Sequence, residues 1–530
     1  MAIDFRFPEE IEHVRHKVRE FIAQVVRPAE REIESHEGDR KVLVEQVVAM
    51  RKAAQEWGLW LPHMPEEYGG MGLGHVAMAA VSAEAAKSRF GPFALNAAAP
   101  DEGNMHTLHH WGTPAQKQKY LRPLCDGRMR SCFAMTEPDV AGSDPTLIQT
   151  RAVADGDDYV INGHKWFISG AHGAQFAILI ARTEDEPEVP QATNTAFLVD
   201  IPSDGWEVVR DIHTMSGPSH NHCEIRITNL RVSKDAILGG RGQGHRLGQY
   251  RLGPARLAHC MRWIGQAEIA LDMTIDRAMK RYAHGSLLAE KQGIQWMIAD
   301  STMELYQCKL MVLHAAYKID RGESFTSEVS MAKHFVANAL NRIIDRAIQV
   351  HGALGYSTDT PLASMATQAR WARFADGADE VHQQPDPGIG AEGSHQERSG
   401  TSLSAGAVAA PVCPRGSSAA QRGSAASDAG HSLGDQRSTV RDAARSRRDW
   451  QRENRAVHAG HRAGEPRTRH HHHRDHPQRP DCRHGRPRAA AGRRPHYRDP
   501  RQHPQGGGVQ PELVSAKRNE SHPHQALARP

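Results

Sequence analysis

The sequence has few features of a secreted or membrane-spanning protein. Its seven cysteines form no CxxC pair and no regular framework, and no apolar run reaches the roughly 18 residues that a membrane-spanning helix needs. The first residues, MAIDFRFPEEIEHV, resemble neither a signal peptide nor an Arg/Ser-rich transit peptide. We therefore expect reduced thiols, a cytoplasmic location and no membrane partner.

Charge and metal-ligand patterns argue against a specific nucleic-acid-binding protein and against a metalloprotein. The formal net charge of +4 is too small to indicate a specific nucleic-acid partner. The run RHHHHRDH (469–476) lacks the defined ligand spacing of a metal site. The segment GGRGQGHRLG (239–248) is not a proper G-x-G-x-x-G motif, so it predicts a connecting loop. We predict neither a specific nucleic-acid partner nor a bound metal.

Aromatic residues and lysine become scarce near the C-terminus. In residues 383–530 the only aromatics are Trp450 and Tyr497, and Lys517 is the only lysine among many arginines. Such a composition cannot bury enough apolar surface to offset the chain entropy of folding, so it predicts a disordered tail with basic character. The same bias is what an out-of-frame reading of GC-rich DNA produces. We hypothesise a frameshift near codon 383; a gene in which no other frame restores an apolar helix would refute it.

Hydrophobic periodicity divides the rest of the chain into three parts. The stretch PEEIEHVRHKVREFIAQVV (8–26) repeats its apolar residues at helical spacing. In the middle, short runs such as FAILIAR (176–182) and CEIRITNLRV (223–232) are typical of strands. After residue 248 the helical period returns. The predicted fold class is α+β, with an N-terminal helical domain (1–128), a small antiparallel β domain (129–240), a C-terminal four-helix bundle (241–382) and the tail (383–530).

Several motifs in a fixed order carry a family resemblance. CFAMTEPDVAGSDP (132–145) followed by INGHKWFISG (161–170) resembles the flavin-binding signature of the acyl-CoA dehydrogenase family. RLGPARLAHCMRWIGQAE (251–268), AIQVHGALGYSTDTPLA (347–363) and RFADGADEVH (373–382) resemble the branch of family members ten and eleven, whose animal forms carry a kinase-like domain. The resemblance runs from about residue 1 to residue 382. It implies FAD as the cofactor, because no side chain accepts a hydride reversibly.

The first motif supplies one part of the implied flavin site. By the resemblance, Thr136 hydrogen-bonds the pyrimidine edge of the isoalloxazine, with Phe133 and Met135 beside it, and Ser143 reaches a phosphate. Read alone, the motif is also compatible with a simple turn. The full implied set of cofactor residues is Phe133, Met135, Thr136, Gly142, Ser143, Phe167, Ile168, Ser169, Arg281, Gln292, Gln349, Gly352 and Ala353.

Later motifs depart from the family pattern in places. Phe167 stands at the position of a usual Trp, and Ser169 replaces a common Thr near the flavin N5; Phe167 is also compatible with simple strand core. Arg281 matches a pyrophosphate-binding arginine that reaches across a subunit interface, although a solvated charge is the alternative. The turn containing Gly352 and Ala353 matches one that approaches a neighbour's flavin, so a homodimer or homotetramer is expected.

The catalytic base is the decisive position. The family most often has a glutamate in a Y-E-G segment, and Asp376 stands at the matching position, one methylene shorter. A minority of family members place the base before the arginine matched by Arg256, but that position is Ala255, which cannot accept a proton. Arg256 and Ser143 are the implied contacts to the acyl-CoA substrate.

The resemblance implies a function in fatty acid β-oxidation. The expected reaction is FAD-dependent α,β-dehydrogenation of an acyl-CoA to the trans-2-enoyl-CoA, with electrons passing to electron-transfer flavoprotein. One alternative is an acyl-CoA oxidase, which passes electrons to oxygen. The other is an inactive or poorly folded product with a basic disordered tail.

Overall fold

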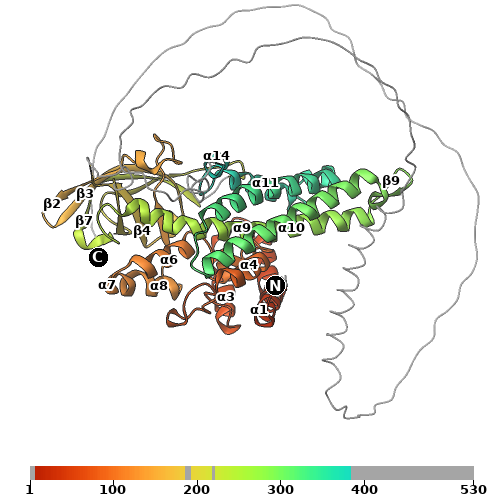
Figure 1. Cartoon of the computed structure of the whole chain (residues 1–530), viewed down its shortest axis with the longest axis horizontal. Helices are drawn as coiled ribbons and strands as arrows, with labels where there is room; N and C mark the ends of the chain where they lie inside the picture. Colours follow the sequence, from red (N-terminus) through yellow and green to blue (C-terminus); the bar gives the residue numbers. More distant parts are fainter. Residues whose placement is uncertain (1–5, 185–192, 218–220, 384–530) are drawn as a thin grey trace, which may run out of the picture. The chain divides into compact units, whose positions relative to one another are not determined.

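The structure is a computed structural model that describes residues 6–184, 193–217 and 221–383 (Figure 1). The predicted tail (383–530) lies outside these residues except for Gln383. No helix in the described part of the chain combines the length and the apolar composition that crossing a bilayer requires.

The N-terminal part is helical, as predicted. Apolar residues at helical spacing, among them Val18 and Phe21, are buried against the neighbouring helices. A π-helical turn (Ile22–Val26) follows the first helix. The helices are α1 (Glu9–Phe21), α2 (Arg27–Ser35), α3 (Arg40–Glu56), α4 (His75–Ala85), α5 (Gly91–Ala94), α6 (Asp101–Trp111), α7 (Pro114–Gln116) and α8 (Arg122–Cys125).

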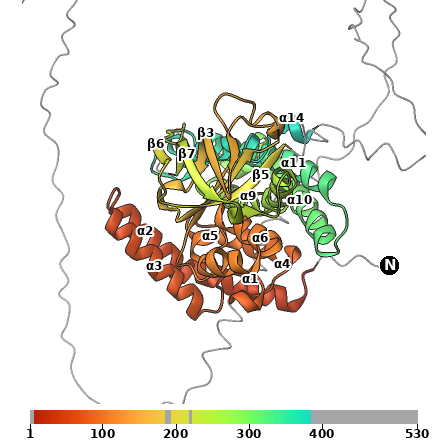
Figure 2. The same cartoon turned by 90° about the vertical axis from the view of Figure 1, so that its left-hand side faces the viewer.

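The middle part is one sheet in the order β6-β7-β3-β2-β4-β5-β8, with β1 beside β4. Most neighbours pair antiparallel, whereas β4 pairs parallel with β1 and β2. Helix α6 lies beside β1, and Figure 2 shows α5 and α6 on one side of β3, β5 and β7. The strands are β1 (Ser131–Ala134), β2 (Arg151–Asp155), β3 (Asp158–Ser169), β4 (Phe176–Arg182), β5 (Asn194–Asp200), β6 (Trp206–Asp211), β7 (His222–Ser233) and β8 (Ile237–Leu238).

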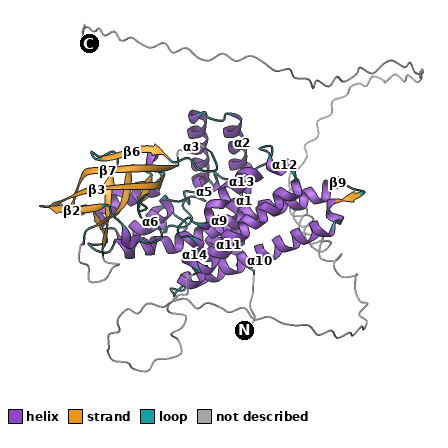
Figure 3. Cartoon of the chain, turned by 90° about the horizontal axis from the view of Figure 1, so that it is seen from above, coloured by secondary structure: helices purple, strands orange, loops and turns teal. Residues whose placement is uncertain are grey.

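Three long helices form the C-terminal part and pack on each other: α9 (Gly244–Lys280), α10 (Gln292–Asp320) and α11 (Thr326–His351). A short hairpin of β9 (Tyr282–Ala283) and β10 (Ser286–Leu287) joins the first two. Figures 1 and 3 show this hairpin at the end of the helices away from β2, β3 and β7. The chain continues through α12 (Ala353–Tyr356), α13 (Leu362–Arg370) and α14 (Asp379–His382). The predicted α+β class is confirmed.

The predicted loop at 239–248 is wrong in its second half, because α9 already begins at Gly244. A Cβ atom at this residue would lie only 2.8 Å from the backbone of Asn194. Glycine therefore serves close packing of the helix start on β5, and its presence does not indicate a loop.

A buried ion pair fixes the segment after β1 to β3. The side chain of Lys165 is fully buried, and its Nζ donates hydrogen bonds to Glu137 Oε1 (2.9 Å) and to the Met135 carbonyl (2.8 Å). Glu137 also accepts from the backbone N–H groups of Gln149 and Thr150. Burial lowers the pKa of Lys165 to about 8, although Glu137 opposes the change. The pair therefore depends on both partners.

We predict that Lys165→Met lowers the free energy of unfolding by about 3–5 kcal/mol, because Glu137 is left as an uncompensated buried charge. Urea denaturation measures this loss. The matched control is Arg231→Met, which removes exposed ion pairs to Asp155 and Asp158 and is expected to lower the free energy of unfolding far less. Equal losses in the two variants would contradict the prediction.

Candidate active site

The candidate base lies in a tight turn between a 3₁₀ turn (Trp371–Arg373) and α14. Asp376 has a φ of +52° and Gly377 a φ of +117°. Aspartate tolerates the left-handed region better than most residues, whereas the second conformation is open to glycine alone. A Cβ atom on Gly377 would also lie 2.7 Å from His382 Nε2. The turn therefore requires a glycine directly after the aspartate.

Two cations from the long helices hold the backbone of this turn. Arg256 of α9 donates from Nε to the Asp376 carbonyl at 2.7 Å. Lys333 of α11 is buried and donates from Nζ to the Gly377 carbonyl. Because both donors come from helices that pack on each other, the turn has one position relative to the bundle.

The Asp376 carboxylate points at a histidine on α9. Its Oδ2 lies 3.3 Å from His259 Nε2, and 27% of the aspartate side chain is exposed. Burial acts to raise the pKa of Asp376, but the hydrogen bond with His259 and the charges of Arg251 and Arg256 outweigh it and hold that pKa well below its usual range. The carboxylate is therefore ionised at neutral pH and can accept a proton.

His259 lies between two tryptophans. Its ring stacks on Trp263 with centroids 5.6 Å apart and meets Trp371 edge-on at 5.3 Å. Its Nδ1 lies 3.3 Å from NH2 of Arg262, which is fixed by Glu102 at 2.7 Å. Trp263, Trp371 and Arg262 therefore together restrict the rotation of the His259 ring.

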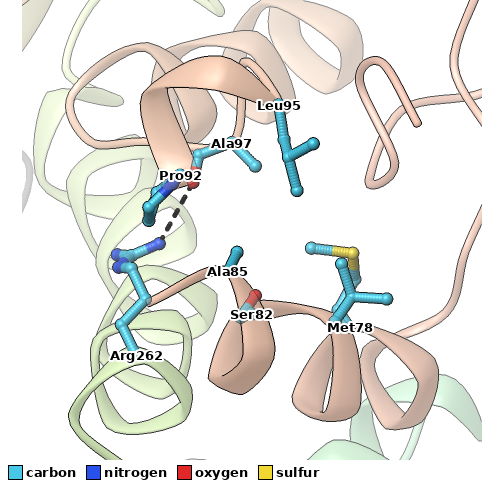
Figure 4. Close-up of a pocket in the computed structure, with 8 residues that line it drawn as sticks. Met78, Ser82, Ala85, Pro92, Leu95, Ala97 and Arg262 are labelled. Carbon is cyan, nitrogen blue, oxygen red and sulfur yellow. Dashed lines mark hydrogen bonds between the residues drawn. The ribbon is translucent and has the colours of Figure 1, made fainter. Parts of the chain in front are cut away.

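Arg262 also borders a narrow pocket, which is lined by α4 and the segment 92–97 (Figure 4). There the Nη1 of Arg262 donates a hydrogen bond to the Ala97 carbonyl at 3.4 Å. The pocket is too narrow to admit a water molecule, so we interpret it as a packing gap.

The two flavin motifs lie together. The backbone N–H of Trp166 donates a hydrogen bond to the backbone carbonyl of Thr136 at 3.0 Å, and this bond joins the loop after β1 to β3. Phe133 packs under the guanidinium of Arg251 at 4.2 Å, and the charge of Arg251 also acts on Asp376. Met135 lies 3.7 Å from the position of a Cβ atom on Gly248. The first motif therefore borders the same stretch of α9 as the candidate base.

The second motif turns an aromatic side chain outward. A bulge between Lys165 and Ile168 gives Phe167 a φ of +53° and leaves 40% of it exposed, whereas Ile168 points into the sheet core. Ser169 Oγ lies 2.9 Å from His222 Nδ1. Phe167 is therefore no strand core residue, and Ile168 can reach a ligand only through its backbone.

The remaining predicted cofactor residues lie elsewhere. Gly142 and Ser143 lie in an exposed loop after β1. Arg281 directly follows α9, whose 37 residues correspond to about 55 Å of helix. Figure 3 shows β9 and α12 on the side away from β2, β3 and β6. The predicted cofactor residues at this far end are all exposed: Arg281, Gln292, Gln349, Gly352 and Ala353. Within one chain, the structure does not bring them together with Thr136.

Sequence reasoning missed His259 and His222. His259 follows Arg256 by three positions, so the two lie on one face of α9, and this spacing was an available signal. His222 pairs with Ser169 in the register of β7 against β3, which no motif indicates.

Three possible metal ligands also come together among the described residues. His172, Asp211 and Cys223 have ligand atoms within 4.8 Å of one another. His172 Nε2 and Asp211 Oδ1 are at hydrogen-bond distance, 2.6 Å, and burial raises the pKa of Cys223 to about 11. We interpret this cluster as a hydrogen-bonded pair beside a thiol.

Three family models match the chain in the order of its parts. The N-terminal domain of acyl-CoA dehydrogenases matches residues 8–128, the middle domain matches 132–230, and the C-terminal domain matches 242–384.

Curated relatives and solved structures agree with these models. A probable acyl-CoA dehydrogenase of Mycobacterium tuberculosis, FadE2, is 41% identical, with 63% of this chain and 82% of that protein covered. Acyl-CoA dehydrogenase family member 10 of Mus musculus is 40% identical over 69% of this chain but only 35% of its own length. A structure from Mycobacterium abscessus, described as an acyl-CoA dehydrogenase, shares 36% identity with a TM-score of 0.68 over 72% of this chain and 97% of its own.

The chain spans only part of the animal relatives. Acyl-CoA dehydrogenase family member 11 of Rattus norvegicus is 36% identical over 70% of this chain and 49% of its own length.

The last described helix gives a prediction for acid stability. His382 is 7% exposed, and its Nε2 has no hydrogen-bond partner in the described part of the chain. Burial lowers the pKa of His382 to about 4, with Arg256 and Lys333 acting in the same direction. The unfolded chain, with a pKa near 6.5, takes up this proton first, so stability is lost as the pH falls from about 6.5 towards 4.

We predict that His382→Gln reduces the slope of the free energy of unfolding against pH by at most about 1.4 kcal/mol per pH unit. Urea denaturation between pH 7 and pH 4 measures the slope. His16→Gln, at a half-exposed histidine, is the matched control and is expected to keep the wild-type slope. An unchanged slope in His382→Gln would show that this histidine does not titrate as its burial implies.

Proposed function

The chain belongs to the acyl-CoA dehydrogenase family, and on that premise we propose that it catalyses the α,β-dehydrogenation of an acyl-CoA thioester to the trans-2-enoyl-CoA, with Asp376 as the base. Membership of this family makes FAD the cofactor and assigns the chain to the flavin-dependent oxidoreductases. The observation that carries the proposed role is the Asp376 carboxylate, which is ionised and partly exposed and belongs to a turn whose backbone Arg256 and Lys333 hold.

The residues present fit FAD. The exposed ring of Phe167 offers an aromatic face, and the hydroxyl groups of Ser169 and Thr136 offer polar contacts near it. The hydrogen bond from Trp166 N–H to the Thr136 carbonyl holds the two motifs in one place. We propose that these residues hold the ring system and that Ser143 contacts a phosphate. Bound FAD supplies the acceptor for the β hydride.

Asp376 would take the α proton. Its low pKa in the free protein keeps it ionised but makes it a weak base. A substrate that displaces water from the partly exposed carboxylate disfavours the charged form and so raises this pKa. Arg256, which is already fixed to the Asp376 carbonyl, would lie beside the thioester end of the substrate.

We propose further that the active form is a homodimer or homotetramer. Arg281 directly precedes β9 and Ala353 begins α12, and Figure 3 shows these two elements on the side away from β3, which contains Phe167. Residues from a second subunit would therefore complete each flavin site, as the resemblance implies for Arg281. A diphosphate suits the bidentate hydrogen bonds of a guanidinium.

Electron-transfer flavoprotein is the proposed electron acceptor, and a catalytic surplus of hydrogen peroxide in air would favour the acyl-CoA oxidase alternative instead. A cytoplasmic location is supported by the free state of all five cysteines in the described residues. The proposed domains are 1–128, 129–240 and 241–382.

We predict that Asp376→Asn lowers the rate of flavin reduction by acyl-CoA about 10²- to 10⁴-fold, because the amide cannot accept the α proton. Anaerobic bleaching of the flavin by a panel of acyl-CoA thioesters measures the rate. Flavin content and Tm are expected to stay at the wild-type values. Glu380→Gln, at an exposed carboxylate nearby, is the matched control and should leave the rate unchanged. Rates of Asp376→Asn within tenfold of wild type would overturn the role of Asp376.

Mixed oligomers test whether two subunits share one site. Asp376→Asn and Arg281→Met subunits with different tags are co-expressed, and the mixed species is purified. Each parent alone should have low activity. The mixed species should regain activity, because one site then combines a wild-type Asp376 with Arg281 of the partner subunit. No regain would mean that Arg281 serves its own chain or no flavin site at all.

A further inference from the structure

The Asp376 side chain is short and therefore needs an external contact to fix its carboxylate. Arg256 and Lys333 hold the backbone of the turn but do not contact the carboxylate oxygens in the described contacts. The contact that reaches the carboxylate is His259 Nε2, 3.3 Å from Oδ2. The other oxygen, Oδ1, is left to accept a proton.

The contacts of His259 define which ring nitrogen carries the hydrogen. A guanidinium has only donors, so Nδ1 of His259 must accept the hydrogen bond from NH2 of Arg262 at 3.3 Å. The imidazole proton then lies on Nε2 and points at Asp376. Glu102 fixes Arg262 in turn through an ion pair of 2.7 Å, with both side chains largely buried. Arg262 therefore donates both to Glu102 and to His259, which leaves the Nε2–H of His259 to donate to Asp376.

The ring of His259 is also fixed mechanically. It stacks on Trp263 with an interplanar angle of 20° and meets the edge of Trp371 at 83°. The side chain is 14% exposed. A ring held by two tryptophans cannot turn to present Nδ1 to Asp376 without losing both contacts and the hydrogen bond from Arg262.

We propose that His259 is a positioning residue for the base: its Nε2–H donates to Asp376 Oδ2 and orients the short carboxylate, while Arg262 fixes the tautomer. This inference rests on the proposed function of Asp376. His259 does not itself accept the α proton, because Nδ1 is engaged and Nε2 already carries a hydrogen.

The charged and titratable groups around the base are few in the described residues and determine what a pH profile reports. Arg251 and Arg256 face Asp376 from α9, and Lys333 faces it from α11. Asp379 and His382 lie on α14, where Asp379 is bound by Arg373 and Asn338. None of these groups changes in a His259 variant, so a shift of the Asp376 titration in such a variant reports the loss of the contact with His259.

The test uses the FAD-loaded full chain and three variants of His259. Gln places an amide N–H near the position of Nε2, Leu removes the donor, and Asn is the second removal variant because its amide is too short. The rate of anaerobic flavin reduction by acyl-CoA is measured from pH 5 to pH 9. Independently of activity, infrared difference titration against Asp376→Asn measures the protonation of the Asp376 carboxyl group in the complex with a non-reactive acyl-CoA analogue, where displacement of water raises its pKa, and it is extended to the lowest pH at which the flavin stays bound.

We expect Leu and Asn to lower the rate about 10- to 100-fold and to move the titration of Asp376 up by about one pH unit. Gln should restore both values to near wild type, while flavin absorbance stays unchanged in all three. An Asp376 titration that does not move in Leu or Asn, or a Gln variant that is as slow as Leu, would overturn the role of His259. Full activity in Asp376→Asn would instead overturn the proposed function itself, so the two failures are distinguishable.

Discussion

The site depends on two cations, the buried Lys333 and the half-buried Arg256, that bind the backbone of one turn. Arg256 and Lys333 come from different helices, and their hydrogen bonds go to consecutive carbonyl groups, those of Asp376 and Gly377. A buried cation is tolerated only when it is hydrogen-bonded, so the helices need the turn as much as the turn needs the helices. The left-handed backbone of Asp376 is maintained by this mutual constraint, whereas the contact that reaches its carboxylate comes from His259.

A second constraint is the length of α9. Its start packs against β5 and the first flavin motif, whereas its end carries Arg281 on the far side of the bundle. A straight helix cannot bring both ends to one ligand. Under the proposed assignment of both groups of residues to FAD, one chain holds two incomplete halves of a cofactor site, and a symmetric pair of chains is the simplest arrangement that unites them.

Much of the fold followed from local sequence patterns, because the period of the apolar residues changes between helical and strand spacing at about residues 130 and 248. The candidate base and the two flavin motifs were recognisable because their residue types occur in a fixed order. Contacts between distant segments were not predictable. The approach of His259 to Asp376 depends on how the turn docks on α9, and the outward turn of Phe167 depends on a bulge that β-strand alternation does not indicate. Gly244 was misread as loop because its close approach to Asn194 is a tertiary contact.

A crystal structure of the FAD-bound protein with an acyl-CoA ligand tests the central claim most directly. With Asp376 as the base, we expect one of its carboxylate oxygens about 3–3.5 Å from the α carbon, on the side of the acyl chain opposite the isoalloxazine ring. A carboxylate that points away from the thioester in that complex, with another side chain beside the α carbon, would contradict it.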